Sequence, residues 1–408
     1  MKSLLLPVAL LALVAAAPAG PFAEVSAARR AAQEAPAADK AAKYDAAMAL
    51  APTSLETVRQ ALSASTEDPK RLVMLIDRFV ALGATFSEPT AAQLLPMLTD
   101  AADRERLAKA LIDNRKPLAF SQPRLTIPPQ IPLVEAIAYD AKRDCLYFSS
   151  VVGQALYARC GAVPAKTLPL PANTGPILGI ALDAAADRLW FVSAPVFGGG
   201  TPSGLFGLDL PTSKVTAIPM PAGVVELGDV AVGQGSEVFA ADSRSGAIYR
   251  LRHGKLAVLV PPGVLHSAQG IAPSPDGKHL HVADYSYGIV RIDLGTGAVQ
   301  PMKVVDNLGL DGIDGLLRHG DDLIAIQNGW RPSRILRLRL SVDEKAITVG
   351  DVLERGHPQH DDPTQGAIVA GQLLYVANSQ WPKYAQNGEQ KPGEGQAPTV
   401  ILALQLLR

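Results

Sequence analysis

The chain has 408 residues, with 38 Lys and Arg against 39 Asp and Glu, so its formal net charge is −1. This balance argues against a nucleic-acid-binding protein, because such proteins usually carry a clustered basic excess. Hydrophobic residues make up 48% and charged residues 19%, which is too apolar for a disordered chain, and 35 Gly with 33 Pro indicate many tight turns.

The first residues have the pattern of a secretory signal. Lys2 supplies a positive start, and an apolar run follows over residues 4–17. The run is shorter than the roughly 20 residues of a membrane span, so we expect cleavage at one of the small residues that follow it. An uncleaved anchor is the alternative. We therefore assign residues 1–27 to a signal peptide and expect a periplasmic or secreted protein without a membrane span.

The next part of the chain changes from a spacer to a helical pattern. Residues 28–43, rich in Ala, Lys and Arg, are interpreted as a loose spacer or a frayed helix, and residues 44–116 show helical periodicity. Four residues are typical helix starts: Ser54, Asp68, Ser87 and Asp100. We predict a small all-α domain of three or four helices, and it resembles a small helical domain of unknown function in exported bacterial proteins. A helix-pair repeat of the tetratricopeptide kind is the alternative, although one unit could not bury its own face.

A strand pattern then recurs six times. Its most apolar strand begins at Leu146, Leu189, Val238, Leu280, Leu323 and Leu374, at spacings of 43, 49, 42, 43 and 51 residues. Each of these strands has a short apolar strand upstream and a third strand downstream. Units of this length with several strands are typical of propeller blades. We predict a mainly β fold, with a six-bladed β-propeller over residues 117–408.

The ring of blades needs a closing strand. The last blade shows only three strands before the chain ends at Arg408, whereas one strand near residues 124–127 precedes the first blade and has no other place. We expect it to pair with residues 400–406. This pairing removes two open sheet edges, which natural β proteins avoid.

The two cysteines flank the turn of a predicted hairpin in the first blade. If the hairpin is centred between Val152 and Gly153, Cys145 lies directly opposite Cys160. Opposed residues of a non-hydrogen-bonded pair approach to about 4.5 Å between Cα atoms, within reach of a disulfide, and an oxidising compartment favours the bond. A register slip of one residue would leave two separately buried thiols instead.

Polar residues precede most of the innermost strands and should meet at one mouth of the central channel. The six positions are Glu135, Leu178, Asp229, Gln269, Asp314 and Gln365. Three carboxylates around one axis repel one another unless a cation or shared protons compensate. Oxygen donors of this kind suit Ca²⁺, with Mg²⁺, Mn²⁺ or Zn²⁺ as alternatives. A water-filled polar channel without a metal is the other interpretation.

At this point the sequence resembles the regucalcin/gluconolactonase family of six-bladed propellers, over roughly residues 120–408. Glu135 matches the acidic ligand of the family's first blade, and Asp314 matches its Asp-Gly ligand, which also serves as catalytic acid/base. Gln269 stands where the family has Asn, and Asp229 remains from an Asn-Asp pair whose first member is Gly228 here. The resemblance implies a metal held by Glu135, Asp229, Gln269 and Asp314, with Asp314 catalytic.

Further groups are predicted at the same mouth. The loop before the last inner strand carries His360, Asp361 and Asp362, which we assign to proton transfer and to substrate binding. An ordinary solvated turn is the alternative. Trp330-Arg331 and Trp381 lie in polar loops, where an indole face suits a sugar-like or lactone ring, unless both are plain loop residues.

Two long insertions should overhang this mouth. Residues 195–203 and 382–398 interrupt connections between second and third strands, and their glycine content suits lids. A Gly-x-Ser-x-Gly motif is missing, which disfavours an ordinary serine hydrolase.

Two functions fit this pattern. The first is metal-assisted hydrolysis of a small lactone or sugar-derived ester, with Asp314 or His360 activating water. The second is a non-catalytic periplasmic propeller with a degraded metal site, which binds a ligand at its mouth or a protein partner through the helical domain.

Overall fold

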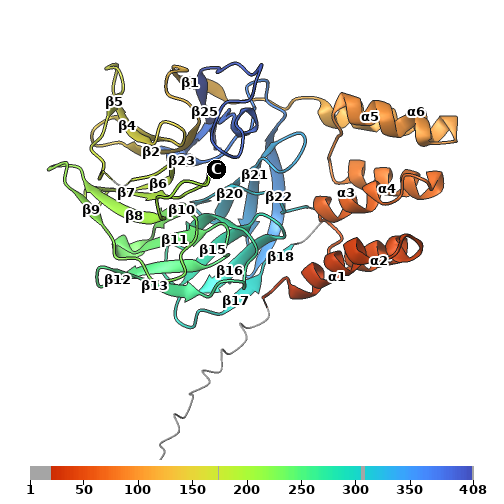
Figure 1. Ribbon diagram of the computed structural model, residues 1–408, viewed down its shortest axis with the longest axis horizontal. Coiled ribbons are helices and arrows are strands. Elements are labelled where there is room, and N and C mark those ends of the chain that lie inside the picture. Colours follow the sequence, from red (N-terminus) through yellow and green to blue (C-terminus); the bar gives the residue numbers. More distant parts are fainter. Residues whose placement is uncertain (1–19, 173, 305–307, 407–408) are drawn as a thin grey trace, which may run out of the picture.

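The computed structural model describes residues 20–172, 174–304 and 308–406, so most of the predicted signal peptide lies outside the described residues. Over these residues the chain forms six sheets arranged as a β-propeller, with helices packed on one side (Figure 1). The fold is therefore mainly β with six blades, as the sequence predicted. Within the described part of the chain, no helix is both long and apolar enough to span a membrane.

The blades follow one another along the chain. Among the consecutive strands of each blade the innermost comes first, and the following strands lie progressively farther from the axis. Blade 1 contains β2 (Val134–Asp140), β3 (Cys145–Ser150), β4 (Ala155–Cys160) and β5 (Lys166–Thr167). Blade 2 contains β6 (Ile177–Asp183), β7 (Arg188–Ser193), β8 (Gly204–Asp209) and β9 (Val215–Ala217). Blade 3 contains β10 (Leu227–Val232), β11 (Val238–Asp242), β12 (Ile248–Arg252) and β13 (Lys255–Val260).

The other three blades vary this plan. Blade 4 contains β14 (Ala268–Pro273), β15 (His279–Asp284), β16 (Gly288–Asp293) and β17 (Val299–Pro301). Blade 5 contains β19 (Gly315–His319), β20 (Asp322–Gln327), β21 (Arg334–Leu340) and β22 (Ala346–Arg355), with β18 (Lys303–Val304) parallel to β22. Blade 6 contains β23 (Gly366–Val369), β24 (Gln372–Val376), β25 (Thr399–Gln405) and β1 (Gln122–Ile127).

The predicted closure of the ring is confirmed. Strand β1 pairs antiparallel with β25, with Leu125 opposite Ile401 and Ile127 opposite Thr399. The first strand of the propeller thus completes the sheet formed by the last strands of the chain. This pairing covers the sheet edges that an open ring would expose.

The cores between blades explain why the second strands are so apolar. Phe148 in β3, Phe191 in β7 and Phe239 in β11 are each at most 1% exposed. Their partners on the inner strands are Ile137, Ile180 and Ala231, respectively. These lie two residues after the positions predicted at the channel mouth, Glu135, Leu178 and Asp229. Both faces of a blade are covered by its neighbours, so its central strands are continuous hydrophobic runs rather than alternating ones.

The predicted disulfide is also confirmed. Cys145 and Cys160 are opposed in the β3–β4 hairpin, with a Cα–Cα distance of 4.0 Å and a sequence separation of 15. Closing a loop of this length restricts the unfolded chain, which corresponds to about 3 kcal/mol in the chain-entropy description. We expect the double variant Cys145→Ser, Cys160→Ser to lose about that much unfolding free energy in urea. Unchanged stability on adding reductant to the wild type would contradict this.

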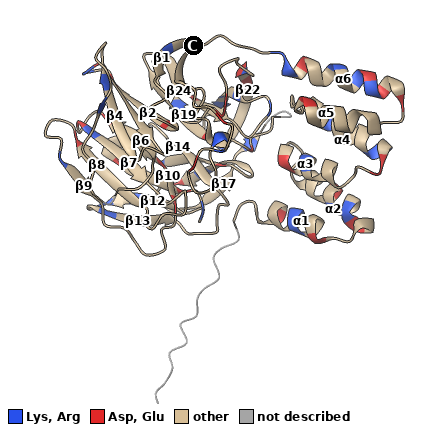
Figure 2. Ribbon diagram, turned by 45° about the horizontal axis from the view of Figure 1, so that its top comes forward, with Lys and Arg blue, Asp and Glu red and all other residues tan. Residues whose placement is uncertain are grey.

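Six α-helices precede the propeller in the described residues. They are α1 (Ala23–Glu34), α2 (Ala37–Leu50), α3 (Leu55–Ser63), α4 (Pro69–Ala81), α5 (Glu88–Leu94) and α6 (Ala101–Arg115), with the 3₁₀-helix η1 (Leu95–Met97) after α5. They form three helix pairs stacked beside one another (Figure 1). We refer to residues 23–115 as the helical layer. Lys and Arg residues are interspersed with Asp and Glu residues along it (Figure 2).

The helix starts that the sequence indicated are found where they were expected. Ser54, Asp68, Ser87 and Asp100 each accept a hydrogen bond from the backbone N–H three residues on, and so cap α3, α4, α5 and α6. These bonds satisfy amide groups that have no partner within the helix.

Of the two interpretations of residues 28–43, the structure has the helical one, because these residues lie in α1 and α2 except for residues 35–36 between them. The N-caps of the two helices are Phe22 and Pro36, and neither makes a side-chain hydrogen bond to its helix. The usual start signal is therefore missing from the sequence. Alanine-rich composition and packing against α3 and α4 through Ala32, Tyr44 and Met48 hold these helices instead.

The helical layer packs on the mouth of blades 4 and 5. Trp330, from the loop between β20 and β21, is 3% exposed and belongs to the same hydrophobic cluster as the helices. Arg29 Nη1 donates to the carbonyl of Ser286 at 3.1 Å. The backbone N–H of Thr85 donates to the carbonyl of Arg331 at 2.7 Å. The helices thus share their core with the propeller and lie beside its predicted functional mouth.

Candidate functional site at the propeller mouth

The axial positions come together as predicted from the blade repeat. Backbone bonds tie neighbouring blades there, since Gln365 N donates to the carbonyl of Glu135 at 3.3 Å and Gly270 N to that of Asp314 at 2.8 Å. The carboxylates of Glu135, Asp229 and Asp314 are close enough to perturb one another electrostatically. Behind them lies a channel of about 420 Å³ lined largely by apolar inner-strand residues.

Asp314 is held by two side-chain amides. Asn328 Nδ2 donates to its Oδ2 at 2.7 Å, and Gln365 Nε2 lies 3.4 Å from its Oδ1. The hydroxyl of Tyr285 donates in turn to Asn328 Oδ1 at 3.0 Å, which fixes the orientation of that amide. Burial raises the pKa of Asp314 to about 7 against the lowering effect of Asn328. A carboxyl group with such a pKa is suited to proton transfer near neutral pH.

Asp229 receives two backbone hydrogen bonds. The N–H of Val230 donates to Oδ1 at 2.8 Å, and the N–H of Ile271 in the next blade donates to Oδ2 at 3.2 Å. Burial nevertheless raises its pKa to about 7. A Cβ at Gly179 would lie 2.6 Å from Asp229 Oδ1. Only glycine at position 179, in the neighbouring blade 2, therefore leaves room for this carboxylate.

Glu135 and Trp381 meet at the axis. Trp381 Nε1, in η3 (Trp381–Lys383), donates to Glu135 Oε2 at 2.6 Å. Burial and the nearby charge of Asp314 raise the pKa of Glu135. The ring of Trp381 also contacts Phe197 at 5.8 Å between centroids, so the insertions at 195–203 and 382–398 lie together over this side of the mouth.

Asp362 adds a fourth carboxylate. Its backbone adopts φ of +66°, an uncommon conformation, and its carbonyl accepts hydrogen bonds from the N–H and hydroxyl of Ser379. Burial, followed by the charges of Asp314 and Asp361, raises its pKa to about 7. Asp361 itself is exposed and lies 3.6 Å from Lys383.

The axial residues fit a cation in the chemistry of their donors. Carboxylate and amide oxygens are hard ligands, and the pKa values of Glu135 and Asp362 are raised first by burial and then by neighbouring carboxylates. Gln269 Oε1 lies next to Gly228, beside Asp229. In residues 20–172, 174–304 and 308–406, however, no three His, Cys, Asp or Glu side chains are gathered as a ready ligand set.

A pocket of about 760 Å³ opens between the helical layer and the mouth; we call it the mouth pocket. Asn328 and Asp362 connect it to the axial carboxylates, and Arg115 and Phe86 contribute the wall from the helices. Arg331 also lines it with an exposed side chain. The face of the helices toward the propeller thus forms one wall of this pocket.

Trp330, which the sequence assigned to substrate binding, lines the mouth pocket but is only 3% exposed and packs mainly into the junction with the helices. The guanidinium of Arg334 lies 3.7 Å above the centroid of its ring, and its Nε1 donates to the carbonyl of Asp311 at 2.8 Å. Trp330 therefore joins the helices to blade 5. Of the two tryptophans, Trp381 is the one that reaches the axis.

His360 lines the mouth pocket but its ring nitrogens do not face the axial carboxylates. Nδ1 lies 3.0 Å from Ser333 Oγ, and Nε2 lies 2.8 Å from the hydroxyl of Tyr375. Burial, assisted by His357, lowers its pKa to about 3. The structure thus separates His360 from the proton-transfer role beside Asp314 that the sequence suggested.

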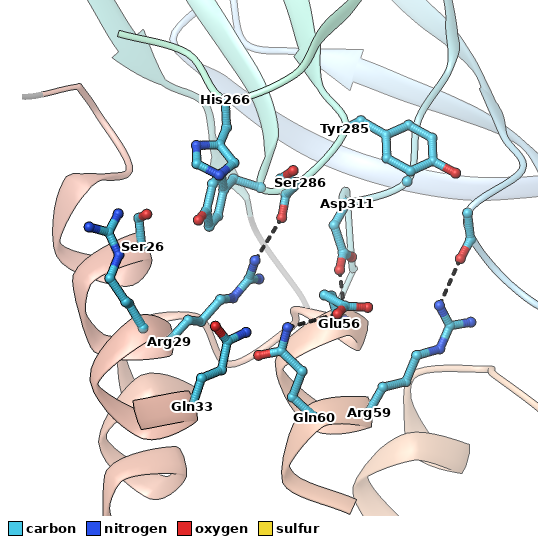
Figure 3. Close-up of a pocket in the computed structure, with 14 residues that line it drawn as sticks. Ser26, Arg29, Gln33, Glu56, Arg59, Gln60, His266, Tyr285, Ser286 and Asp311 are labelled. Carbon is cyan, nitrogen blue, oxygen red and sulfur yellow. Dashed lines mark hydrogen bonds between the residues drawn. The ribbon is translucent and has the colours of Figure 1, made fainter. Parts of the chain in front are cut away.

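A second pocket, of about 410 Å³, lies where α1 and α3 meet blades 4 and 5 (Figure 3). Arg59 Nη1 donates to the carbonyl of Gly329 at 3.1 Å, and Asp311 Oδ2 accepts from the N–H of Glu56 at 3.0 Å. Tyr285 lines this pocket and also begins the hydrogen-bond chain to Asp314. The contacts of the helical layer are therefore linked to the axial site.

Sequence reasoning missed the residues that orient the axial carboxylates. Asn328 was recognised only as part of a polar loop, and Tyr285 was not singled out. Both lie in connections between second and third strands, at the mouth where such loops were expected. Their place in the repeat is the one signal that could have identified them.

No family model matches this sequence, and a search of curated proteins finds no match. Among solved structures, the chain is similar to a luciferin-regenerating enzyme, at 12% identity and a TM-score of 0.50, covering 71% of this chain and 95% of that one. It is also similar to a gluconolactonase from Xanthomonas campestris, at 16% identity and a TM-score of 0.49, covering 69% and 88%. A regucalcin from Agrobacterium tumefaciens, described as calcium-binding, gives 16% identity and a TM-score of 0.48, covering 71% and 96%.

The chain is a six-bladed β-propeller. At such identities the likeness concerns the fold, and any activity has to be argued from the residues at the mouth.

Proposed function

We propose that the protein hydrolyses lactones or related small esters at the axial end of the mouth pocket. The observation that carries this is the group of buried carboxylates whose pKa values burial has raised, Asp229, Asp314 and Asp362 to about 7. Such groups are typical of sites that transfer protons near neutral pH. Arg331, Asp361, Asp362 and Trp381 supply the polar and aromatic contacts for the substrate.

Asp314 is the general base in this proposal. Its Oδ2 receives the short bond from Asn328, whereas Gln365 lies 3.4 Å from Oδ1, so Oδ1 is the atom that takes a proton from water. The amides of Asn328 and Gln365 hold the carboxylate toward the axis. Trp381 orients Glu135 in the same way.

The proposal includes a divalent cation, with Ca²⁺ first and Mg²⁺, Mn²⁺ or Zn²⁺ as alternatives, held by Glu135, Asp229, Gln269 and Asp314. Such an ion, when bound, polarises an ester carbonyl. The carboxylates supply the negative charge that it would neutralise. The helical layer and the two insertions restrict access of bulk water to the same space.

Replacing Asp314 by Asn tests this function. The variant keeps the shape of the side chain but cannot accept a proton, so kcat/KM for lactones should fall at least 100-fold. The measurement is a hydrolysis screen over γ- and δ-lactones and sugar lactones, with metal content determined on the same samples. Asp39→Asn, an exposed change on α2, is the matched control.

Undiminished hydrolysis by Asp314→Asn of every substrate turned over would remove the mechanism. Failure of the wild type to hydrolyse any of them, with Ca²⁺, Mn²⁺ or Zn²⁺ added, would favour the non-catalytic binding propeller instead.

We also propose that the protein is exported to the periplasm or beyond the cell. The disulfide supports this, because such bonds persist in oxidising compartments. Cleavage after residue 27 would remove the first turn of α1, whereas cleavage after residue 17 would leave α1 whole. The mass of the mature protein from fractionated cells tests both statements, and an intact N-terminus in the cytoplasmic fraction would contradict them.

A further inference from the structure

Four polar side chains form one hydrogen-bonded chain beside the mouth pocket. Ser333 Oγ lies 3.0 Å from His360 Nδ1, and His360 Nε2 lies 2.8 Å from the hydroxyl of Tyr375. The Tyr375 hydroxyl donates to Glu354 Oε2 at 2.8 Å. Glu354 is fully buried, and its Oε1 accepts from the N–H groups of Phe120 and Ser121 at 2.6 Å each.

This chain determines which nitrogen of His360 carries the hydrogen. A carboxylate only accepts, so the single hydrogen of the Tyr375 hydroxyl is used on Glu354. The tyrosine oxygen can then only accept from His360, which places the imidazole hydrogen on Nε2. Nδ1 therefore holds a lone pair, and the hydroxyl of Ser333 donates to it. Burial, followed by the charge of His357, lowers the pKa of His360 to about 3, so the ring is neutral at neutral pH and is a weaker base than a free imidazole.

Two backbone hydrogen bonds fix the segment that carries Ser333. The preceding loop is fastened to the helical layer by the bond from Thr85 N to the carbonyl of Arg331, and the carbonyl of Ser333 accepts from Gly356 N at 2.9 Å. Ser333 and His360 both line the mouth pocket of about 760 Å³. A serine hydroxyl, an unprotonated histidine nitrogen and a third group that orients the histidine are the arrangement of an activated nucleophile.

We propose that Ser333 is the nucleophile and His360 the general base of a second, acyl-transfer centre that acts on small carboxylic esters in the mouth pocket. Tyr375 and Glu354 are positioning residues. This centre needs no metal ion and goes beyond the function proposed for the axial carboxylates.

The reaction balances with water as the only co-reactant. Ser333 Oγ bonds to the ester carbon while its proton moves to His360 Nδ1, and the carbonyl electron pair moves to oxygen. Collapse of this adduct breaks the bond to the alkoxide, which leaves with the proton from His360. Water then attacks the acyl-serine, His360 takes its proton, and the acid is released as that proton returns to Ser333 Oγ.

Labelling with a fluorophosphonate tests the proposal on the full-length protein. Attack by Ser333 on phosphorus expels fluoride and leaves a stable adduct, which peptide mass spectrometry locates. We expect one adduct, on Ser333, in the wild type. Ser333→Ala should abolish it, and His360→Gln should slow it at least 100-fold. Ser63→Ala, at an exposed serine on α3, is the matched control.

Two further variants test whether Tyr375 positions His360 and whether the two proposed centres act independently. Tyr375→Phe should slow labelling about tenfold while Ser333 remains the labelled residue, because the tautomer of His360 is no longer selected. Asp314→Asn should be labelled at the wild-type rate, so failure of the axial mechanism and failure of this one are distinguishable. Circular dichroism of each variant verifies its fold. Absence of an adduct on Ser333 in the folded wild type, or labelling that persists in Ser333→Ala at the same rate, would overturn the proposal.

Discussion

Replacing Trp330 by alanine is expected to destabilise the protein by about 3–5 kcal/mol, the usual range for a fully buried tryptophan. The indole fills the junction between the helical layer and blade 5, with Arg334 stacked on it at 3.7 Å. Arg334 is itself buried, and burial lowers its pKa to about 9. Loss of the indole would therefore leave a cavity, and it would remove the aromatic ring that packs on the buried guanidinium of Arg334.

Urea unfolding followed by circular dichroism measures this effect. Trp330→Phe keeps a ring at the junction but loses the hydrogen bond to the carbonyl of Asp311. The lost bond should lower the unfolding free energy by about 1 kcal/mol, in addition to the effect of the smaller buried area. Trp381→Ala serves as a partly exposed control at the mouth. A loss below about 1 kcal/mol for Trp330→Ala would show that the helical layer is held elsewhere. Faster proteolysis between residues 116 and 121 in this variant would show that the layer detaches.

We expect pH and calcium to have a second large effect on the stability of the folded protein. The pKa of Asp314 is raised from 3.8 to about 7 in the folded protein, so between pH 4 and 7 the folded state holds a proton that the unfolded state has lost. This proton contributes stability at low pH, and that contribution disappears as the pH rises toward 7. Asp229 and Asp362 act in the same direction. His281 and His360 act in the opposite direction below about pH 6.5, because their pKa values are lowered.

Comparison of variants isolates the carboxylate contribution. Asp314→Asn should become more stable relative to the wild type as the pH is raised from 5 to 8 in the presence of EDTA. Calcium should raise the melting temperature of the wild type more at pH 8 than at pH 5, because protons and the cation compete for the same oxygens. Asp39→Asn is the control for both measurements. Equal calcium effects in the wild type and Asp314→Asn would exclude the axis as the binding site.

The sequence predicted the parts of the structure that depend on repetition and short-range geometry. Six strand triplets at regular spacing indicated six blades, and one unassigned strand indicated how the ring closes. Cys145 and Cys160 could be paired because the register of a hairpin follows from the position of its turn. The axial carboxylates followed from the same repeat, since each lies within the first three residues of an inner strand or directly before it.

The helical layer shows where local signals are insufficient. α3 to α6 begin at side chains that cap them, and these starts were recognised. α1 and α2 begin without such caps, so their ordered structure depends on packing against the later helices and the propeller. Local propensity alone does not decide such cases.

The propeller ring, its closure, the disulfide and the approximate set of axial residues were thus determined by the sequence itself. Only the tertiary structure decided that Trp330 joins the helices to blade 5 and that Ser333, His360, Tyr375 and Glu354 form one chain. These four residues come from separate strands and loops, with no motif and no fixed spacing. Their contacts depend on how blades 5 and 6 pack and how each side chain turns, and the hydrophobic periodicity that specifies the fold carries no information about either.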